Sequence, residues 1–389
     1  MHFKFLRMNK YILSFTSALL FFTISKEAVG QNGGDPSSNS EQIASRVINT
    51  AVPFLIITPD SRSGGMANAG AAISPDANAV HWNNAKLAFL ESDYGFSLSY
   101  TPWLSRLIND MSISYLAGYY KISDFQTVAI SMRYFDLGKI QLIDMNKALG
   151  NEISPKEYSF DGTYSMKLSE NLGVGITGRF IYSDISEDIG TDDASPGTSV
   201  AADIGVYYNS NPNFRGNLSN IAFAAHISNI GRKLSYNSSA NRDFLPTNLR
   251  LGTAYTTHFD PYNKITLALD FNKLLVPTLP DTANETTMLG GMFKSFTDAP
   301  DGFSEELKEI GVSIGAEYWY NNLFAARLGY SYEHPDKGSW QYFTVGLGFR
   351  YQVFGVDFAY LVPTGEENPL GETLRFSLLF NFDQGNNPR

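Results

Sequence analysis

The sequence has no cysteine among its 389 residues, and this absence removes several kinds of chemistry at once. A chain without thiols forms no disulfide, offers no thiolate to a metal, has no cysteine nucleophile and lacks the lipidated cysteine of a lipoprotein. With no disulfide to stabilise it, the chain must be stabilised by the packing and hydrogen bonds of its fold.

Long apolar runs are equally scarce, and this limits how the chain can meet a membrane. The apolar run at residues 11–24 is shorter than the ~20 residues of a spanning helix. Because basic residues precede it and small residues follow it, residues 1–30 are predicted to be a secretory signal peptide cleaved before Gln31. The mature chain is expected to leave the cytoplasm, and it could reside in a membrane only as a β-barrel.

Charge is sparse too, with 17% charged residues and a formal net charge of -10. Since no basic patch offsets the acidic total, nucleic acid is not expected as a partner. Aromatic residues reach 14% alongside 33 glycines, a balance that suits a barrel girdled by aromatic side chains. A pair of soluble β-sandwiches would share much of this composition.

From residue 93 onward, apolar and polar residues alternate with the period of β-strands, in about 14 segments. In the second segment the interpreted apolar face consists of Met111, Ile113, Tyr115, Ala117 and Tyr119. Charged residues fall on the opposite face of their segments: Arg133, Lys167, Arg179, Asp203, Arg250, Asp270, Glu317, Arg327, Arg350, Asp357 and Arg375. In a barrel this face lines the lumen, where the arginines could line an anion path but are expected instead to pair with acids on the wall and with groups of the N-terminal segment.

The lengths of the connections separate a barrel from a sandwich. Connections after even-numbered segments are short, whereas those after odd-numbered segments are mostly long, with extremes at residues 136–156, 228–247 and 272–309. Short periplasmic turns and longer extracellular loops produce this alternation, and a sandwich has no reason for it. We therefore expect an all-β membrane protein, a 14-stranded antiparallel outer-membrane β-barrel over residues 93–382 with a tail at 383–389 and both termini in the periplasm.

Residues suited to catalysis are few. Of the five histidines, His2 lies in the signal peptide, His258 and His334 in connections, His226 on a strand and His81 in the N-terminal segment. No hydrolase, zinc or phosphate-loop motif stands at a strand-to-helix junction. We expect a non-enzymatic protein with no cofactor and no metal site.

Residues 31–92 neither alternate nor fit a turn. After a polar lead and a short predicted helix at 41–49, residues 58–73 are mostly small. Such a segment cannot build a core alone and suits a confined space, so we expect it to plug the lumen.

The most specific pattern lies in this segment, in residues 59–66 (PDSRSGGM), 74–78 (SPDAN) and 81–86 (HWNNAK). These residues resemble the hatch region of the PorV family of the type IX secretion system, and the barrel resembles the wider FadL-like family of fatty-acid channels. The resemblance covers the mature chain. Its key positions are Pro59, Asp60, Arg62, Gly64, Gly65, Met66, Asp76, Trp82 and Asn83. At Asn84 the FadL-like pattern usually has proline, and this departure weakens a hydrocarbon-channel interpretation.

The resemblance implies a shuttle in contact with outer-membrane lipid. Such a protein binds the C-terminal signal domains of secreted cargo at the exit of the translocon channel protein and passes them to the surface sortase and attachment complex. The FadL-like likeness implies an alternative, a channel for hydrophobic small molecules such as long-chain fatty acids. A third alternative is a structural or enzymatic barrel with no transport role. The only evidence against it is that the sequence has no recognisable set of catalytic residues.

The longest connection, residues 272–309, carries more apolar residues than a loop in water would keep exposed. Either it folds onto the barrel mouth or it docks a partner, and the sequence leaves both alternatives open. The first connection repeats the feature. Because aromatic anchors give large contact areas, the candidates for cargo or partner contact are Trp103, Leu104, Phe293, Phe296 and Phe303.

Overall fold

The structure is a computed structural model. It describes residues 47–104, 110–143, 149–185, 195–214, 217–236, 242–278, 286–338, 340–364, 371 and 373–383. The predicted signal peptide, the polar lead and residues 384–389 of the predicted tail lie outside the described residues.

Fourteen antiparallel strands of the described chain form one sheet that closes on itself, as predicted. Each strand pairs with the next along the chain, and β17 pairs back to β1. The strands are β1 (Tyr94–Pro102), β2 (Ser112–Ser123), β3 (Gln126–Asp136), β6 (Lys156–Lys167), β7 (Leu172–Asp184), β8 (Gly197–Ser210), β10 (Asn217–Gly231), β11 (Asn248–His258), β12 (Asn263–Leu274), β13 (Gly311–Tyr320), β14 (Phe324–Tyr332), β15 (Tyr342–Tyr351), β16 (Phe354–Pro363) and β17 (Leu374–Phe382).

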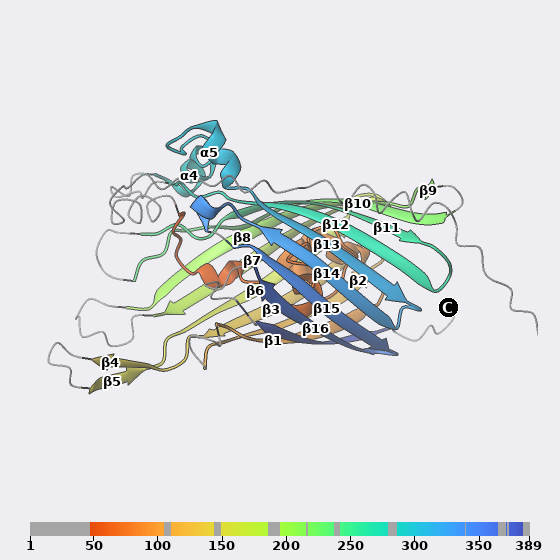
Figure 1. The fold of residues 1–389 in the computed structure, drawn as a ribbon, viewed down its shortest axis with the longest axis horizontal. Coiled ribbons are helices and arrows are strands. Elements are labelled where there is room, and N and C mark those ends of the chain that lie inside the picture. The colour runs from red at the N-terminus through yellow and green to blue at the C-terminus, as the bar shows by residue number, and fades with distance from the viewer. Residues whose placement is uncertain are drawn as a thin grey trace, which may run out of the picture. The chain divides into compact units, whose positions relative to one another are not determined.

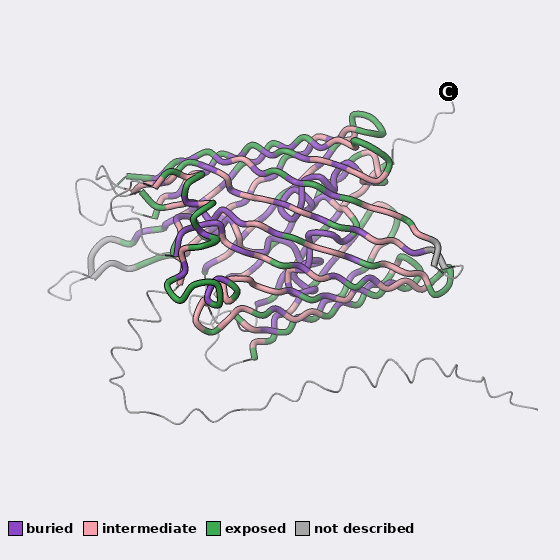
Figure 2. Tube along the Cα trace, turned by 90° about the horizontal axis from the view of Figure 1, so that it is seen from above, coloured by how far each residue is buried: buried purple, intermediate pink, exposed green. Residues whose placement is uncertain are grey.

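Exposure alternates along these strands, because successive side chains point to opposite faces of a sheet. Buried and exposed positions follow one another around the wall (Figure 2). The outward positions are apolar, and the charged strand residues named above point inward. The alternation confirms the predicted faces in every strand but one.

The exception is β2, whose predicted outward residues are buried inside the barrel: Met111, Ile113, Tyr115, Ala117 and Tyr119. Leu116 and Tyr120 face outward instead. The inward face of β2 packs against residues of the N-terminal segment such as Val80 and Leu87, so it is apolar as well. With both faces apolar, hydrophobicity could not tell them apart, and the prediction was wrong.

The connections sort by length between the two ends of the barrel, as predicted (Figure 1). One end, the short-turn end, holds turns such as 168–171 and 352–353. The other, the long-loop end, holds further strands and helices within its connections: the hairpin β4 (Ile140–Ile143) with β5 (Leu149–Ile153), and the helices α4 (Met288–Lys294) and α5 (Phe303–Lys308). The remaining short elements are β9 (Asn213–Phe214) and η3 (Pro335–Lys337).

Residues 47–92, called here the lumenal segment, lie inside the barrel. They form the short helices η1 (Pro53–Ile56), α2 (Ser61–Gly64), α3 (Ala79–Trp82) and η2 (Asn84–Phe89). Their hydrogen bonds reach inward-facing residues of strands all around the wall, including β3, β7, β12, β13 and β17. No helix within the described ranges is long and apolar enough to cross a membrane.

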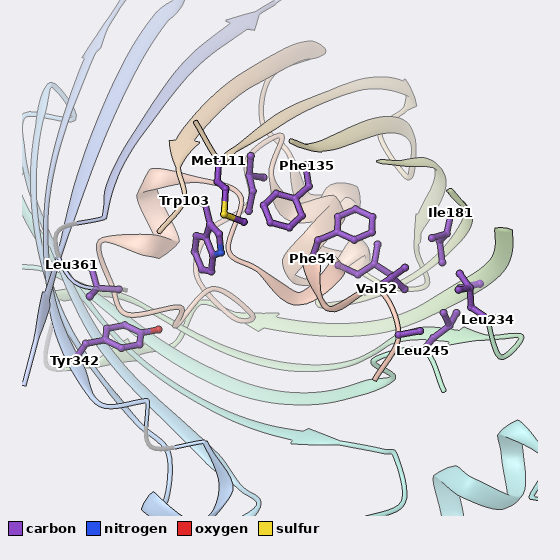
Figure 3. Packing of buried hydrophobic residues seen from close by; sticks show 14 of the residues in the cluster. Val52, Phe54, Trp103, Met111, Phe135, Ile181, Leu234, Leu245, Tyr342 and Leu361 are labelled. Carbon is purple, nitrogen blue, oxygen red and sulfur yellow. The ribbon is translucent and has the colours of Figure 1, made fainter. Parts of the chain in front are cut away.

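An apolar cluster joins the lumenal segment to the wall near the long-loop end (Figure 3). Phe54 stacks on Phe135 of β3 with 6.3 Å between ring centroids. Val52 and Phe54 also share this cluster with Leu234 and Leu245 of the β10–β11 connection. The lumenal segment and the barrel therefore share one hydrophobic core, to which each contributes buried side chains.

The seam between the first and last strands carries stacked aromatic rings on its outer face. Tyr94 faces Phe382 with 5.0 Å between ring centroids, and Phe96 faces Phe380 at 4.5 Å. Such cross-strand pairs stabilise the joint where the two ends of the sheet meet.

Candidate functional site

A helix cap at Asp60 organises the part of the lumenal segment that carries the PDSRSGGM sequence. The Asp60 carboxylate accepts a hydrogen bond from the Ser63 backbone N–H at 2.9 Å, as expected of an N-cap residue. The indole Nε1 of Trp82 donates to the other oxygen at 2.6 Å. Burial raises the pKa of Asp60, which is fully enclosed. The cap therefore ties α2 to α3 across the lumen.

Arg62, one residue further into α2, connects the segment to the wall. Its guanidinium donates to both oxygens of Glu317 on β13, at 2.9 and 2.8 Å, and to Asp76 at 3.0 Å. Burial alone would lower the pKa of Arg62, but the carboxylates of Glu317 and Asp76 together outweigh it and hold that pKa well above its usual value. A paired, fully hydrogen-bonded charge of this kind fixes position more than it adds net stability.

The same acid continues the network along the wall. Glu317 also accepts from Arg327 of β14 at 2.7 Å, and Arg327 donates to Asp357 of β16 at 2.8 Å. Asp357 in turn pairs with Arg350 at 2.6 Å. A continuous chain of alternating charges thus runs from the lumenal segment across four strands, β13 to β16.

Glycines allow the segment to lie directly on the wall and on itself. A Cβ added at Gly329 of β14 would lie 2.3 Å from the carbonyl carbon of Met66. A Cβ added at Gly70 would lie 2.4 Å from the indole ring of Trp82. A Cβ added at Gly65 would lie 3.1 Å from the Cα of Gly346 on β15, so small residues are needed beside Met66 as well.

The HWNNAK sequence forms the second half of the contact. Trp82 lies under the guanidinium of Arg250, 4.5 Å from its ring centroid. Asn83 caps η2 by accepting from the Ala85 N–H at 3.1 Å, and its amide donates to the Val206 carbonyl at 3.0 Å. Asn84, the departure from the FadL-like pattern, donates to the Thr177 hydroxyl at 2.9 Å. Proline at 84 would lack this bond.

Lys86 was not among the predicted site residues, although it is buried at the centre of the segment. Its ammonium donates to the Gly70 carbonyl at 2.7 Å. Burial lowers the pKa of Lys86 to about 8. Although Lys86 ends the HWNNAK sequence, its burial could not be predicted, because a single lysine is normally solvated.

Sequence reasoning also missed Arg133 as a ligand of the lumenal backbone. Its guanidinium donates to the carbonyls of Phe54 and Leu55 and to Nδ1 of His81, the last at 2.8 Å. Burial, and then the charge of Arg133, hold the pKa of His81 well below its usual value. Arg179, Arg327 and Arg350 form the predicted ion pairs with acids of the wall, while Arg133 and Arg250 contact groups of the lumenal segment, as the other half of the prediction held. Among the described residues no carboxylate forms an ion pair with Arg133, Arg250 or Arg375.

A second candidate site lies at the long-loop end, in residues 286–310, called here the rim platform. Two lysines anchor it to the barrel. Lys273, at the end of β12, pairs with Glu306 at 3.0 Å and Glu309 at 2.5 Å. Lys337, in the β14–β15 connection, pairs with Glu305 at 2.8 Å and again with Glu309 at 2.9 Å. These side chains are almost fully buried, so they hold α5 in one place.

The platform nevertheless turns apolar side chains toward solvent. Phe293 and Phe303 are each 76% exposed and Phe296 is 44% exposed. Leu289 and Leu307 are also exposed beside them. Neither of the two alternatives left by the sequence describes it fully, because the platform is docked on the barrel and still exposes its aromatic residues.

Trp103 and Leu104 lie elsewhere, contrary to the expected exposure. Trp103 is 6% exposed and belongs to the apolar cluster at the mouth, where Met111 lies beside it (Figure 3). Leu104 packs against the same cluster. The ring of Trp103 is covered by the barrel itself, so its proposed contact with a partner loses its basis.

Together, a closed barrel of 14 described strands, an apolar outer face and a charged inner face define an outer-membrane β-barrel. The family model described as type IX secretion system protein PorV matches residues 38–281, and the chain belongs to this family. No curated protein matches the sequence.

Several solved barrels are similar in structure. The Ralstonia pickettii toluene transporter TbuX shares 12% identity over 83% of this chain and 98% of its own, with a TM-score of 0.46. The Pseudomonas putida toluene transporter TodX shares 12% identity over 83% and 98%, with a TM-score of 0.48. A Pseudomonas aeruginosa FadL homologue shares 11% identity over 86% and 100%, with a TM-score of 0.43.

Proposed function

We propose that this protein is a non-enzymatic cargo shuttle of the type IX secretion system. It binds the C-terminal signal domain of secreted cargo at the exit of the translocon channel protein and passes the cargo to the surface sortase and attachment complex. The observation that carries the proposal is the rim platform, which holds Phe293, Phe296 and Phe303 in solvent on an anchored scaffold. Membership of the PorV family gives the system in which it acts.

The energetics of the platform support a binding role. Apolar area left in water costs about 25 cal/mol for each Å², so a patch of large exposed side chains is most favourable where a partner covers it part of the time. Aromatic side chains are frequent hot spots, and a scaffold that is already rigid loses little conformational entropy on binding. The buried lysine pairs supply that rigidity.

The lumenal segment acts in this proposal as a permanent hatch. Its capped helices and its paired charges at Arg62 and Glu317 favour one fixed position. The alternative function, a channel for hydrophobic small molecules, requires an apolar route past the segment. The polar network from Arg62 to Arg350 is a poor lining for such a route.

The orientation follows from the two ends. We infer that the long-loop end faces the cell exterior, where cargo emerges. The short-turn end, where β17 ends, then faces the periplasm. The rim platform then stands on the outer surface, surrounded by the headgroups of outer-membrane lipid.

The direct test replaces the three aromatic residues together, Phe293→Ser, Phe296→Ser and Phe303→Ser. None lies on a strand, so the barrel should still assemble and remain heat-modifiable. Capture of a purified cargo signal domain should weaken at least about tenfold, as expected for lost hot spots. The matched control is Phe259→Ser, which removes a comparably exposed ring from a turn at the short-turn end and should leave capture unchanged. Undiminished capture by the triple variant would refute the role of the platform.

A second test separates the two functions in the cell. Deletion of the gene should leave type IX cargo stranded in the periplasm under the shuttle proposal. Slower uptake of long-chain fatty acids with normal cargo export would instead favour the channel.

A further inference from the structure

Arg375 of β17 is a buried arginine whose charge has no direct partner. Its side chain points into the lumen and is 3% exposed, and its Nε is buried without a hydrogen-bond acceptor. Across the part of the chain that the structure describes, no hydrogen bond or ion pair reaches the guanidinium. A guanidinium keeps its charge in a protein, so leaving it buried and unpaired is strongly unfavourable.

Asp60 lies within electrostatic reach of Arg375 but does not pair with it. Its two carboxylate oxygens accept hydrogen bonds from the Ser63 N–H and from the indole of Trp82 instead. Burial raises the pKa of Asp60, which favours the neutral carboxyl and weakens any compensation of the arginine. The charge of Arg375 therefore needs a negative charge from another source.

Small side chains surround the guanidinium on the wall and in the lumenal segment. Continuing the register of β1 and β17 by one residue places Thr101 beside Arg375, and Ala359 is its partner on β16. The Thr101 hydroxyl is fully buried and has no hydrogen-bond partner among the described residues. From the lumenal side, a Cβ added at Gly64 would lie 3.0 Å from Cδ and 3.4 Å from Nη1 of Arg375. The donors of Arg375 and Thr101 therefore adjoin a region lined by residues with little bulk.

This region is covered in both directions along the barrel. Toward the long-loop end, Trp103 follows β1 and Leu361 lies on β16, and both belong to the apolar cluster at the mouth (Figure 3). Toward the short-turn end, Ser377 is the next inward residue of β17, and its hydroxyl accepts from the Ser61 backbone N–H at 2.9 Å. A ligand beside Arg375 has to be small, and it would be shielded from bulk water.

We propose that Arg375 and Thr101 bind a small monovalent inorganic anion such as chloride, next to Gly64 of the lumenal segment. One negative charge matches the single unpaired guanidinium, whereas a divalent anion would leave an excess charge buried. The N–H groups of the arginine and the threonine hydroxyl are all donors, which is what an anion requires. Bound water would accept the same hydrogen bonds but would leave the charge uncompensated. The anion then joins the first and last strands of the barrel at the level of α2.

The test is whether chloride stabilises the protein through Arg375. Chloride replaces gluconate at constant ionic strength, and the midpoint of urea unfolding in detergent is measured. Because a ligand that binds only the folded state stabilises it as ligand is added, the midpoint of the parent should rise with chloride. In Arg375→Met the midpoint should not respond. The control Arg133→Met removes a buried arginine that is bonded to the carbonyls of Phe54 and Leu55, and it should keep the response.

Thr101→Val keeps the shape of the side chain and removes only the hydroxyl, so it tests the site even if Arg375→Met fails to fold. Loss of one hydrogen bond to a charged ligand should raise the chloride concentration needed for half of the response about tenfold. Heat modifiability confirms that each variant is folded. A parent midpoint that is indifferent to chloride would overturn the proposal, and so would an equal response in Arg375→Met. An unshifted response in Thr101→Val would overturn the site as drawn.

Discussion

In the lumen the N-terminal segment meets the barrel wall through arginine, whereas at the rim the platform meets it through lysine. Arg62 makes two parallel bonds to Glu317 and reaches Asp76 as well, a geometry that fixes orientation. Lys273 and Lys337 act as point charges between acids at and beside α5. In the lumen, the paired charges fix the segment in one orientation against the wall. At the rim, the ion pairs fix the platform to the barrel while its apolar side chains remain exposed to solvent.

The largest expected effect comes from breaking the lumenal network at its shared acid. Glu317→Gln removes the buried carboxylate that Arg62 and Arg327 share and leaves each arginine with a single acid partner, which should destabilise the protein by about 3–5 kcal/mol. Urea unfolding in detergent, followed by heat modifiability, measures the change. The matched control is Glu152→Gln, which removes the partner of Lys139 in an exposed ion pair and should change stability little. Equal losses in the two variants would mean that burial does not matter here.

The fit of the segment against itself gives the next effect. Gly70→Ala places a Cβ 2.4 Å from the ring of Trp82, which is held by Asp60 on one side and Arg250 on its face. Overpacking should cost about 1–3 kcal/mol and should displace the segment enough to raise ion conductance in planar bilayers. Gly162→Ala is the control, since an added Cβ there meets nothing within 4 Å. Conductance that stays as low as in the parent protein would show that the hatch tolerates the change.

At the rim, Lys273→Met tests whether the platform depends on its anchor. Loss of one buried partner of Glu306 and Glu309 should loosen the platform by about 1–3 kcal/mol while the barrel stays intact. Faster amide exchange across residues 286–310 and weaker capture of cargo are the measurements. Lys308→Met removes a partly exposed pair with Asp336 and should have a much smaller effect. If both variants exchange alike, the buried lysine is not the anchor.

The smallest effect is a dependence of stability on pH that arises from Lys86 in the lumenal segment. Burial lowers the pKa of Lys86 to about 8, below its unfolded value, so the folded state binds fewer protons than the unfolded state between these two values. Stability should therefore rise as pH increases through 8, by about 0.8 kcal/mol between roughly pH 7 and 8.5. The quantity to measure is the difference in this slope between the parent and Lys86→Met, where the contribution should vanish. Identical slopes would contradict a buried, neutralising lysine.

Most of the barrel could be predicted from the sequence, because a wall with one apolar and one polar face gives the chain a period of two. The prediction failed at β2, where contact with the lumenal segment makes Tyr115 and Tyr119 inward residues. It failed at Trp103 because a connection can fold back into the mouth, and connection length carries no information about that. The pairing of Arg62 with Glu317 joins residues 255 positions apart, and residue type alone does not select that acid among the others on the wall.

The direct passage from the lumenal segment into β1 also constrains how the protein is made. The first strand completes the wall only by pairing with the last, at the seam where Tyr94 and Phe96 meet Phe382 and Phe380. A contact between the two ends of a chain forms late, because it closes the longest loop. Folding therefore has to lay the lumenal segment in place while the wall is still open, since a finished barrel would require this segment to be threaded into it. The strands of the wall therefore assemble around the lumenal segment, and the pairing of β1 with β17 at the aromatic seam closes the barrel last.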